Sequence, residues 1–312
     1  MGKNTRIIIN AVILAAAMTV AASLALVRFD IPVDNLKRDF ANESSRFVTV
    51  GGMEVHYRDE GRGFPLVLIH GTAASLHTWD GWAEALTKNF RVIRMDLPAF
   101  GLTGASPDRD YTIGAYVRFI DSFLVKLGIP RCHIAGNSLG GLIAWNYALA
   151  HPGKVEKLIL IDSAGHPHSS IPFIFRLVRL PLGDVLGQYI GPRFLIEQNL
   201  REVYGDTSRI TPEIVDRYYR LSLRKGNRRA FIDRARTVED RGSMAKKITG
   251  IRIPTLIIWG KEDAWIPLDD AYKFKNEIGG SVLKVYDGAG HIPMEEIPEI
   301  TARDARRFLL GI

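Results

Sequence analysis

Short, continuously apolar runs recur along the chain and alternate with segments of helical periodicity. These runs are PLVLIHG (65–71), RVIRMDLP (91–98), CHIAGNS (132–138), VEKLILIDS (155–163), PTLIIWGKED (254–263) and SVLKVYDGAGH (281–291). A strand that is apolar without alternation is typical of a parallel sheet that helices cover on both faces. The alternation therefore predicts an α/β fold in which a mostly parallel sheet is flanked by helices.

The remaining regular segments complete this sheet. Residues 46–61 are typical of an antiparallel hairpin that turns at Gly51 and Gly52, which brings the expected strands to eight. The stretch 111–128 places its apolar residues on one face of an expected helix. A last helix is expected over 295–310. With 312 residues, the chain has room for one large domain with an insertion.

The interval 164–253 interrupts the alternation of strands and helices. Its sequence is helix-like and poor in strand patterns, with stops at proline and glycine. We interpret it as an inserted helical cap, over about 165–247, above the carboxyl edge of the sheet. The folded domain as a whole is expected to span 46–312.

The first 28 residues have the composition of a membrane-directed segment. Lys3 and Arg6 precede 21 mostly apolar, uncharged residues, Ile7–Val27. About 20 apolar residues span a bilayer, whereas the apolar part of a cleaved signal is usually about 7–15 residues long. We therefore predict an uncleaved anchor over 1–28, with a cleaved secretory signal as the alternative. The polar residues 29–45 are interpreted as a linker.

The charges around this apolar run predict its orientation. Positive charges that precede a membrane span favour a cytoplasmic N-terminus. The folded domain is therefore expected to be anchored on the extracytoplasmic, periplasmic-type side of a membrane. If the segment were cleaved, the domain would be secreted instead.

The net charge of +7 is concentrated in the predicted cap. Residues 165–247 carry 16 Lys and Arg against 9 Asp and Glu, which leaves 25 of each in the rest of the chain. A local basic excess suits a surface that faces anionic lipid or another anionic partner, but we favour the simpler explanation of solvated helix faces. No nucleic-acid-reading motif accompanies the charge, so no nucleic-acid partner is expected. The sequence makes no prediction of the oligomeric state.

One apolar run ends in a serine that glycines flank. HIAGNSLGGLIAW (133–145) places Ser138 between Gly136 and Gly140, after an expected strand and before an expected helix. Small residues on either side let the backbone turn tightly, so that the serine protrudes from the carboxyl edge of the sheet. The free N–H groups at the start of the helix suit a developing oxyanion. Ser138 is therefore a candidate nucleophile, and a plain strand-to-helix turn is the alternative.

A serine nucleophile needs a base and an acid that orients the base. Of the eight histidines, His291 lies in a glycine-rich loop after the last expected strand, at the same sheet edge as Ser138. Asp263 follows the preceding strand and is the favoured acid. Asp162 also follows a strand and is the competing acid, whereas Asp269 is better interpreted as a helix N-cap.

The order of these residues, together with two further motifs, resembles that of the α/β-hydrolase superfamily. The motifs HGTAASLHTWDGW, DLPAFGLTG, GNSLGG, WGKEDAWIP and GAGHIPMEE carry the resemblance, which runs from about residue 46 to the C-terminus and is weakest in the cap. It implies Ser138 as nucleophile, Asp263 as acid and His291 as base. It also implies an oxyanion hole built from the backbone N–H groups of Thr72 and Leu139.

Three positions of the motifs can be compared with the branches of the superfamily, and one of them, Ser138, discriminates between branches. Relatives often have glycine where Ala99 stands, which affects a loop turn and not the chemistry. A serine at 138 argues against the dehalogenase and epoxide-hydrolase branches, in which that position is an aspartate. Asn137 occurs among esterases, acylglycerol lipases and carbon–carbon bond hydrolases, so it does not discriminate between them.

No metal or organic cofactor is expected. His166 and His168 lie close in sequence, but no cluster of carboxylates accompanies them, so they make a weak metal site. Cys132 is the only cysteine, which excludes an intrachain disulfide and a cysteine-based metal cluster. Hydrolysis through an acyl-enzyme needs neither metal nor cofactor.

We therefore expect a serine hydrolase that cleaves a small-molecule carboxylic ester. The apolar part of the cap, 171–190, is expected to line an acyl pocket above Ser138, although packing against the core or contact with a membrane also explains it. Anchor, apolar cap and basic excess together favour lipid-like or medium-chain esters. The alternatives are cleavage of a carbon–carbon bond by the same fold, and a membrane-anchored binding protein without catalysis.

Overall fold

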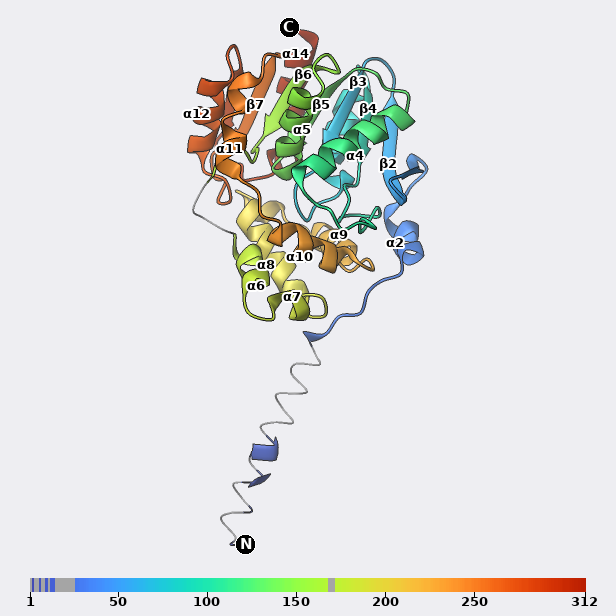
Figure 1. Ribbon diagram of the computed structural model, residues 1–312, viewed down its shortest axis with the longest axis vertical. Coiled ribbons are helices and arrows are strands. Elements are labelled where there is room, and N and C mark those ends of the chain that lie inside the picture. Colours follow the sequence, from blue (N-terminus) through green and yellow to red (C-terminus); the bar gives the residue numbers. More distant parts are fainter. Residues whose placement is uncertain (1, 3–5, 7–8, 11, 15–25, 168–171) are drawn as a thin grey trace.

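A single mixed sheet organises the protein in the computed structural model, which describes residues 2, 6, 9–10, 12–14, 26–167 and 172–312 (Figure 1). Within those residues the strand order is β1-β2-β4-β3-β5-β6-β7-β8. The strands are β1 (Ser45–Val50), β2 (Met53–Gly61), β3 (Pro65–Ile69), β4 (Arg91–Met95), β5 (Cys132–Asn137), β6 (Val155–Ile161), β7 (Thr255–Gly260) and β8 (Val282–Tyr286). Antiparallel pairing is confined to β1 with β2 and β2 with β4, and all other neighbours are parallel. The predicted eight-stranded, mostly parallel sheet is confirmed.

The continuously apolar runs form the buried centre of this sheet. Every residue of β5 and of β7 is buried, as are four of the five residues of β3. Each fully buried leucine or isoleucine side chain stabilises the fold by roughly 1.5–3 kcal/mol. The central strands are therefore a rigid platform for the loops that follow their carboxyl ends.

Helices cover the sheet and pack against one another. They are α3 (Asp80–Leu86), α4 (Ile113–Lys126), α5 (Leu139–Ala150), α12 (Leu268–Glu277), α13 (Pro293–Glu296) and α14 (Pro298–Leu310), with the shorter turns η1 (Leu76–Trp79) and η3 (Ile248–Gly250). α4 packs against α5, and both lie in front of the strands in Figure 1. α3 packs against α14, where Trp82 Nε1 donates a 2.9 Å hydrogen bond to Thr301 Oγ1. The start of α4 is fixed by Thr112, whose side chain accepts a hydrogen bond from the Ala115 N–H.

A group of helices between β6 and β7 forms the predicted cap. It comprises α6 (Phe173–Arg179), α7 (Gly183–Leu186), α8 (Arg193–Val203), η2 (Thr207–Arg209), α9 (Pro212–Ser222), α10 (Asn227–Arg236) and α11 (Arg241–Ala245). Figure 1 shows α6 to α10 together at one end of the sheet. The cap therefore lies where the loops after β5, β7 and β8 open.

The segment 29–45, predicted as a linker, is instead part of the folded domain. It contains α2 (Val33–Phe40), whose Leu36 is fully buried against Leu102 and Leu221. Asp39 forms an ion pair with Arg220 of α9. The sequence carried a signal for this helix, because its three apolar residues are spaced for one helical face.

The residues just before α2 also contact the cap. Val27 forms an isolated antiparallel bridge with Ile190, and the carboxylate of Asp30 lies 2.7 Å from Arg228 Nη2. The chain therefore leaves the predicted anchor along the surface of the cap. Among the described residues, no helix is long and apolar enough to cross a membrane. Most of the predicted anchor, 1–28, lies outside the described residues.

Candidate active site

Ser138 occupies a sharp turn between β5 and α5. Its backbone has φ 54° and ψ −114°, a region that non-glycine residues seldom adopt, and its N–H donates a 3.0 Å hydrogen bond to Ile161 O. A Cβ at Gly136 would lie 2.2 Å from Gly140 O, and a Cβ at Gly140 would lie 2.1 Å from Ile69 O. Both glycines are therefore required for this turn, which explains the motif sterically.

His291 and Asp263 meet at the same edge of the sheet. His291 follows β8, Asp263 follows β7, and His291 Nδ1 lies 2.7 Å from Asp263 Oδ2. The other carboxylate oxygen of Asp263 accepts hydrogen bonds from the N–H groups of Trp265 (2.7 Å) and Ile266 (3.0 Å). Because an ionised carboxylate can only accept, His291 carries its proton on Nδ1 and presents an unprotonated Nε2.

The acceptor nitrogen Nε2 of His291 is buried. Among the described residues it has no hydrogen-bond partner, and in this structure no hydrogen bond joins it to Ser138. Such contacts are often long before substrate binds and shorten in the complex. Asn137 ties the two loops together, because its Nδ2 donates to His291 O (2.8 Å) and to Ile161 O (3.2 Å). No pattern in the sequence indicates this role for Asn137.

The competing acid, Asp162, lies behind Asp263. It is fully buried, its φ is 42°, and its Oδ1 accepts a 2.9 Å hydrogen bond from Gly260 N. Burial raises the pKa of Asp162 well above its usual value, and the charge of Asp263 raises it further. A protonated Asp162 can donate a hydrogen bond to Asp263. The acid in contact with His291 is therefore Asp263, as predicted, and Asp162 touches the acid instead of the base.

The same three side chains are the candidate ligands for a metal ion. One ligand atom from each of Asp162, Asp263 and His291 falls within 4.8 Å of the others. However, His291 Nδ1 is hydrogen-bonded to Asp263, and a protonated carboxyl is a poor ligand. The donor set fits a carboxylate hydrogen-bonded to an imidazole, beside a protonated carboxyl, better than it fits a metal.

The two predicted oxyanion donors border the cavity that Ser138 lines. Thr72 lies in the turn after β3, and Leu139 is the first residue of α5. Within the described part of the chain, neither backbone N–H has a hydrogen-bond acceptor. The first N–H groups of a helix have no partner inside it, and they carry the positive end of its dipole. Both N–H groups are therefore available to a negatively charged oxygen.

His70, for which the sequence analysis predicted no role, supports the turn that holds Thr72. His70 is fully buried, its Nδ1 lies 2.7 Å from Gly71 O, and its Nε2 accepts a 2.9 Å hydrogen bond from Leu97 N. Burial lowers the pKa of His70, so its ring is neutral and Nδ1 carries the proton. Gly71 is needed here because a Cβ would lie 2.8 Å from Asn137 Oδ1.

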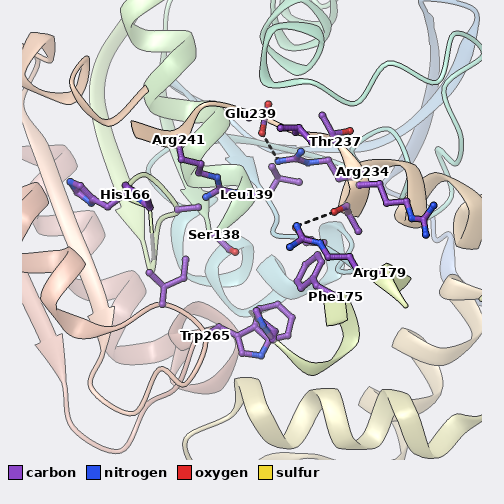
Figure 2. Close-up of a pocket in the computed structure, with 18 residues that line it drawn as sticks. Ser138, Leu139, His166, Phe175, Arg179, Arg234, Thr237, Glu239, Arg241 and Trp265 are labelled. Carbon is purple, nitrogen blue, oxygen red and sulfur yellow. Dashed lines mark hydrogen bonds and ion pairs between the residues drawn. The ribbon is translucent and has the colours of Figure 1, made fainter. Parts of the chain in front are cut away.

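Ser138 opens into a cavity of about 600 Å³ beneath the cap (Figure 2). Phe175 of α6 and Trp265 lie on one side of it, with ring centroids 5.8 Å apart. The side chains of Arg234 and Arg241 lie on the side opposite these aromatic rings. The cavity thus combines an aromatic wall with a basic one.

A second cavity, of about 540 Å³, lies beneath the cap without reaching Ser138. It is lined mainly by apolar side chains, among them Ala99 and Phe100 of the core and Ile174, Leu177 and Val178 of α6. Most of the apolar stretch 171–190, which was expected above Ser138, lines this second cavity instead. Of the described part of that stretch, Pro172, Phe175 and Arg179 line the cavity at Ser138.

The remaining candidates are not part of the contact between His291 and Asp263. His166 Nε2 lies 2.8 Å from Glu277 Oε2, and its predicted companion His168 lies outside the described residues. Asp269 is in the first turn of α12, and the N-cap is Pro267. The tight turn at Ala99 has a φ of 86°, which accounts for the glycine expected there among relatives.

The fold and this serine turn define the class: the chain belongs to the α/β hydrolases. A family model described as alpha/beta hydrolase fold matches residues 65–298. The match covers the sheet from β3 onward, the cap and all the candidate site residues.

Relatives within this family have two kinds of named activity. The chain is 30% identical to 2-hydroxy-6-oxo-2,4-heptadienoate hydrolase of Pseudomonas putida over 80% of its length and 90% of the relative. It is 28% identical to 2-hydroxy-6-oxo-6-(2'-aminophenyl)hexa-2,4-dienoic acid hydrolase of Metapseudomonas resinovorans over 85% of its length and 90% of the relative. The solved structure of a bacterial membrane phospholipase A is 27% identical, with a TM-score of 0.73, and covers 98% of both chains.

Proposed function

We propose that the protein is a serine hydrolase that cleaves lipid-like or medium-chain carboxylic esters. His291 Nε2 takes the proton of Ser138 Oγ, which attacks the ester carbonyl carbon. The carbonyl oxygen becomes an oxyanion and accepts hydrogen bonds from the N–H groups of Thr72 and Leu139. The imidazolium then returns its proton to the departing alcohol. Water, activated by the same histidine, hydrolyses the acyl-enzyme to the carboxylic acid and frees Ser138.

One observation carries this proposal. The 2.7 Å contact between His291 Nδ1 and Asp263 leaves an unprotonated Nε2 at the sheet edge where Ser138 turns. The carboxylate holds the imidazole in the tautomer that a base needs and stabilises its charged form. Each oxyanion donor typically contributes about 2.7–4 kcal/mol to the stability of the transition state.

Two further features favour ester substrates. The apolar side chains of Phe175, Trp265 and Ile266 in the cavity at Ser138 suit an acyl chain, because apolar ligands bind in concave, largely apolar cavities. The likeness to a membrane phospholipase A extends over 98% of this chain, and thus into the N-terminal segment. Cleavage of a carbon–carbon bond is the second candidate, since the two dienoate hydrolases cover most of the chain. A binding protein without catalysis is disfavoured, because the residues of the catalytic site are all present.

Labelling by a fluorophosphonate probe tests the nucleophile. We expect wild type to label and Ser138→Ala to lose labelling completely. Ser163→Ala is the matched control, because Ser163 is a buried serine after the neighbouring strand and donates to Ala164 O. Failure of wild type to label would refute the catalytic proposal.

A comparison of substrates separates the two candidate reactions. Wild type is assayed on 4-nitrophenyl esters from acetate to dodecanoate and on 2-hydroxy-6-oxo-2,4-heptadienoate. We expect turnover of the esters, with a maximum at medium or long chains. Maximal activity on acetate that falls steadily with chain length would contradict lipid-like esters. Faster cleavage of the dienoate than of any ester would establish the carbon–carbon alternative.

We further propose that the first 28 residues anchor the protein and that the domain lies on the extracytoplasmic side of the membrane. Large apolar side chains are exposed on the cap and on the segment that leads to it, which supports contact with lipid; they are Leu180, Leu182, Tyr189 and Phe194 of the cap and Phe29. Membrane fractionation of the full chain, and of a variant without residues 1–25, tests anchoring. The intact N-terminus, detected by mass spectrometry, distinguishes an anchor from a cleaved signal. Digestion by protease added to spheroplasts tests the orientation.

A further inference from the structure

The basic wall of the cavity at Ser138 contains more positive charge than the chain itself neutralises. Four arginines line this cavity, Arg179, Arg234, Arg236 and Arg241, together with one carboxylate, that of Glu239. Figure 2 shows Arg234, Arg241 and Arg179 around the space above Ser138. Counting these lining groups alone, the cavity has an excess of positive charge.

Two of the four arginines are paired with carboxylates. Arg234 Nη2 lies 3.1 Å from Glu239 Oε2, and both side chains are buried. Arg236 Nη1 lies 3.0 Å from Asp184 Oδ2, which directs its charge away from the cavity and toward α7. The positive charges of Arg234 and Arg236 are therefore offset within the protein.

Arg179 and Arg241 have no carboxylate partner in the part of the chain that the structure describes. The residues outside the described part of the chain include no aspartate or glutamate. They therefore add no carboxylate partner for either arginine. Arg179 donates one long hydrogen bond, 3.4 Å, to Ala235 O. The Arg241 side chain donates none to any described residue. Two guanidinium groups thus face the same cavity with most of their donors free.

The environment of Arg241 makes its lack of a partner costly. Its side chain is partly buried and extends toward Leu139 and Ser138 in Figure 2. Burial lowers the pKa of Arg241 and the charge of Arg234 lowers it further, whereas the charge of Glu239 raises it. A guanidinium remains protonated in proteins. A partly desolvated guanidinium whose N–H donors have no partner is unfavourable until an anion binds it.

We propose that Arg241, assisted by Arg179, binds an anionic group of the substrate, a carboxylate or a phosphate, in the cavity at Ser138. The inference rests on the proposed function and adds to it the class of substrate: an ester that carries a negative charge beside its apolar part. Guanidinium forks bind carboxylate and phosphate oxygens through paired N–H donors. The aromatic wall of Phe175 and Trp265 contacts the apolar portion on the opposite side of the cavity.

Paired substrates that differ in one charge test the proposal. The carboxylate pair is 4-nitrophenyl hemiglutarate and its methyl ester. The phosphate pair is 1-butanoylglycerol 3-phosphate and 1-butanoylglycerol. The kcat/KM of each is measured with the full chain in neutral detergent. We expect wild type to prefer the anionic member of at least one pair by about tenfold or more. The pair with the larger preference identifies the anion, and equal rates within both pairs would overturn the proposal.

Variants assign the preference to Arg241. Arg241→Gln should lower kcat/KM for the preferred anionic substrate about 10- to 100-fold and leave its neutral partner nearly unchanged. Arg241→Lys should recover part of the loss, because it restores the charge without the fork. Arg236→Gln is the matched control, since this arginine lines the same cavity but is paired with Asp184. Equal losses on both members of a pair would indicate a structural role and overturn the assignment.

A binding measurement keeps this inference separate from the proposed function. Two proteins are compared by calorimetric titration, Ser138→Ala and the double variant that also carries Arg241→Gln. Each is titrated with 4-nitrophenyl hemiglutarate, with 1-butanoylglycerol 3-phosphate and with their neutral partners. Tighter binding of an anionic member that depends on Arg241 supports the anion site even if wild type hydrolyses no ester. In that case the proposed ester hydrolysis fails and the binding site stands. Equal binding of anionic and neutral members would overturn the site itself.

Discussion

The carboxyl edge of the sheet and the cap above it are built on different principles. At the edge, polar side chains position one another: Asp162 lies beside Asp263, Asp263 holds His291, and Asn137 ties the His291 loop to the serine turn. In the cap, one short helix presents two unlike faces to two cavities. Phe175 and Arg179 of α6, four residues apart, line the cavity at Ser138, while Ile174, Leu177 and Val178 line the apolar one.

From this difference we infer that the edge carries out the reaction and that the cap selects the substrate. The edge is rigid, because its residues follow fully buried strands, and it presents the reacting groups in one arrangement. We infer that the cap selects the substrates that reach those groups, through the side chains that α6 directs into each cavity. We therefore expect changes at the edge to alter kcat, and changes on α6 to alter the preference among substrates.

The largest expected effect concerns the two neighbouring carboxyls of the edge. Asp263→Asn should lower kcat about 10⁴-fold, because an amide no longer imposes the tautomer of His291 or stabilises its charged form. Asp162→Asn should retain kcat within about tenfold, because an amide, like a protonated carboxyl, can donate a hydrogen bond to Asp263. Steady-state kinetics on one ester measures both.

A large loss of activity in Asp162→Asn would contradict the different roles given to the two carboxyls. If Asp162→Asn lost as much activity as Asp263→Asn, the edge would depend on a second charged acid and not on a neutral donor. Circular dichroism of both variants shows whether either change disturbs the fold, since both side chains are buried.

The edge was largely predictable from the sequence. Parallel strands buried on both faces leave long apolar runs, and their carboxyl ends share one edge, so the order of the residues along the chain is enough to place Ser138, Asp263 and His291 together. Between Asp162 and Asp263 the sequence could only favour one, because both follow strands. The hydrogen bond to His291 separates them, and that contact depends on the exact path of two loops.

The cap and the N-terminal segment were less predictable, because tertiary contacts decide them. The stretch 171–190 places apolar residues on both faces of α6, so composition alone did not reveal two cavities. In the sequence, Arg241 is only one of the residues of the basic excess in the cap. The sequence does not show which charged side chains pair, because pairing depends on packing in three dimensions. Leu36 is the one fully buried residue of a polar segment, and its docking on Leu221 of the cap made α2 part of the domain.

The next effect in size tests α6 as the boundary between the cavities. Phe175 lines the cavity at Ser138 and packs on Phe231, which lines the apolar cavity. Phe175→Ala should open a passage between them and raise the ratio of kcat/KM for dodecanoate over butanoate about tenfold, while butanoate turnover changes little. Chain-length series of 4-nitrophenyl esters measure the ratio.

Phe231→Ala is the matched control for this boundary. It enlarges the apolar cavity but leaves Phe175 in place, so the chain-length ratio should change by no more than about threefold. A large loss of butanoate turnover in Phe175→Ala would show that α6 positions the catalytic groups, contrary to the separation of chemistry from selection.

The smallest expected effect is on stability and concerns the proton of Asp162. Its pKa is raised in the folded protein, so above about pH 3.8 the unfolded chain loses this proton while the folded protein keeps it. The folded state then binds more protons, and the free energy of unfolding falls as pH rises from 3.8 until the raised pKa is reached. The slope from this one group is at most about 1.4 kcal/mol per pH unit.

Asp162→Asn should remove that slope, because the amide does not titrate. Chemical denaturation of wild type and Asp162→Asn at a series of pH values above 4 gives the difference directly, since other titrating groups contribute alike to both proteins. Asp263 and Glu296 also raise the pKa of Asp162 through their charges, so its proton belongs to the folded arrangement of the edge. Parallel curves for the two proteins would mean that Asp162 is ionised in the folded state, and the edge would then hold two adjacent charges that its burial makes hard to accommodate.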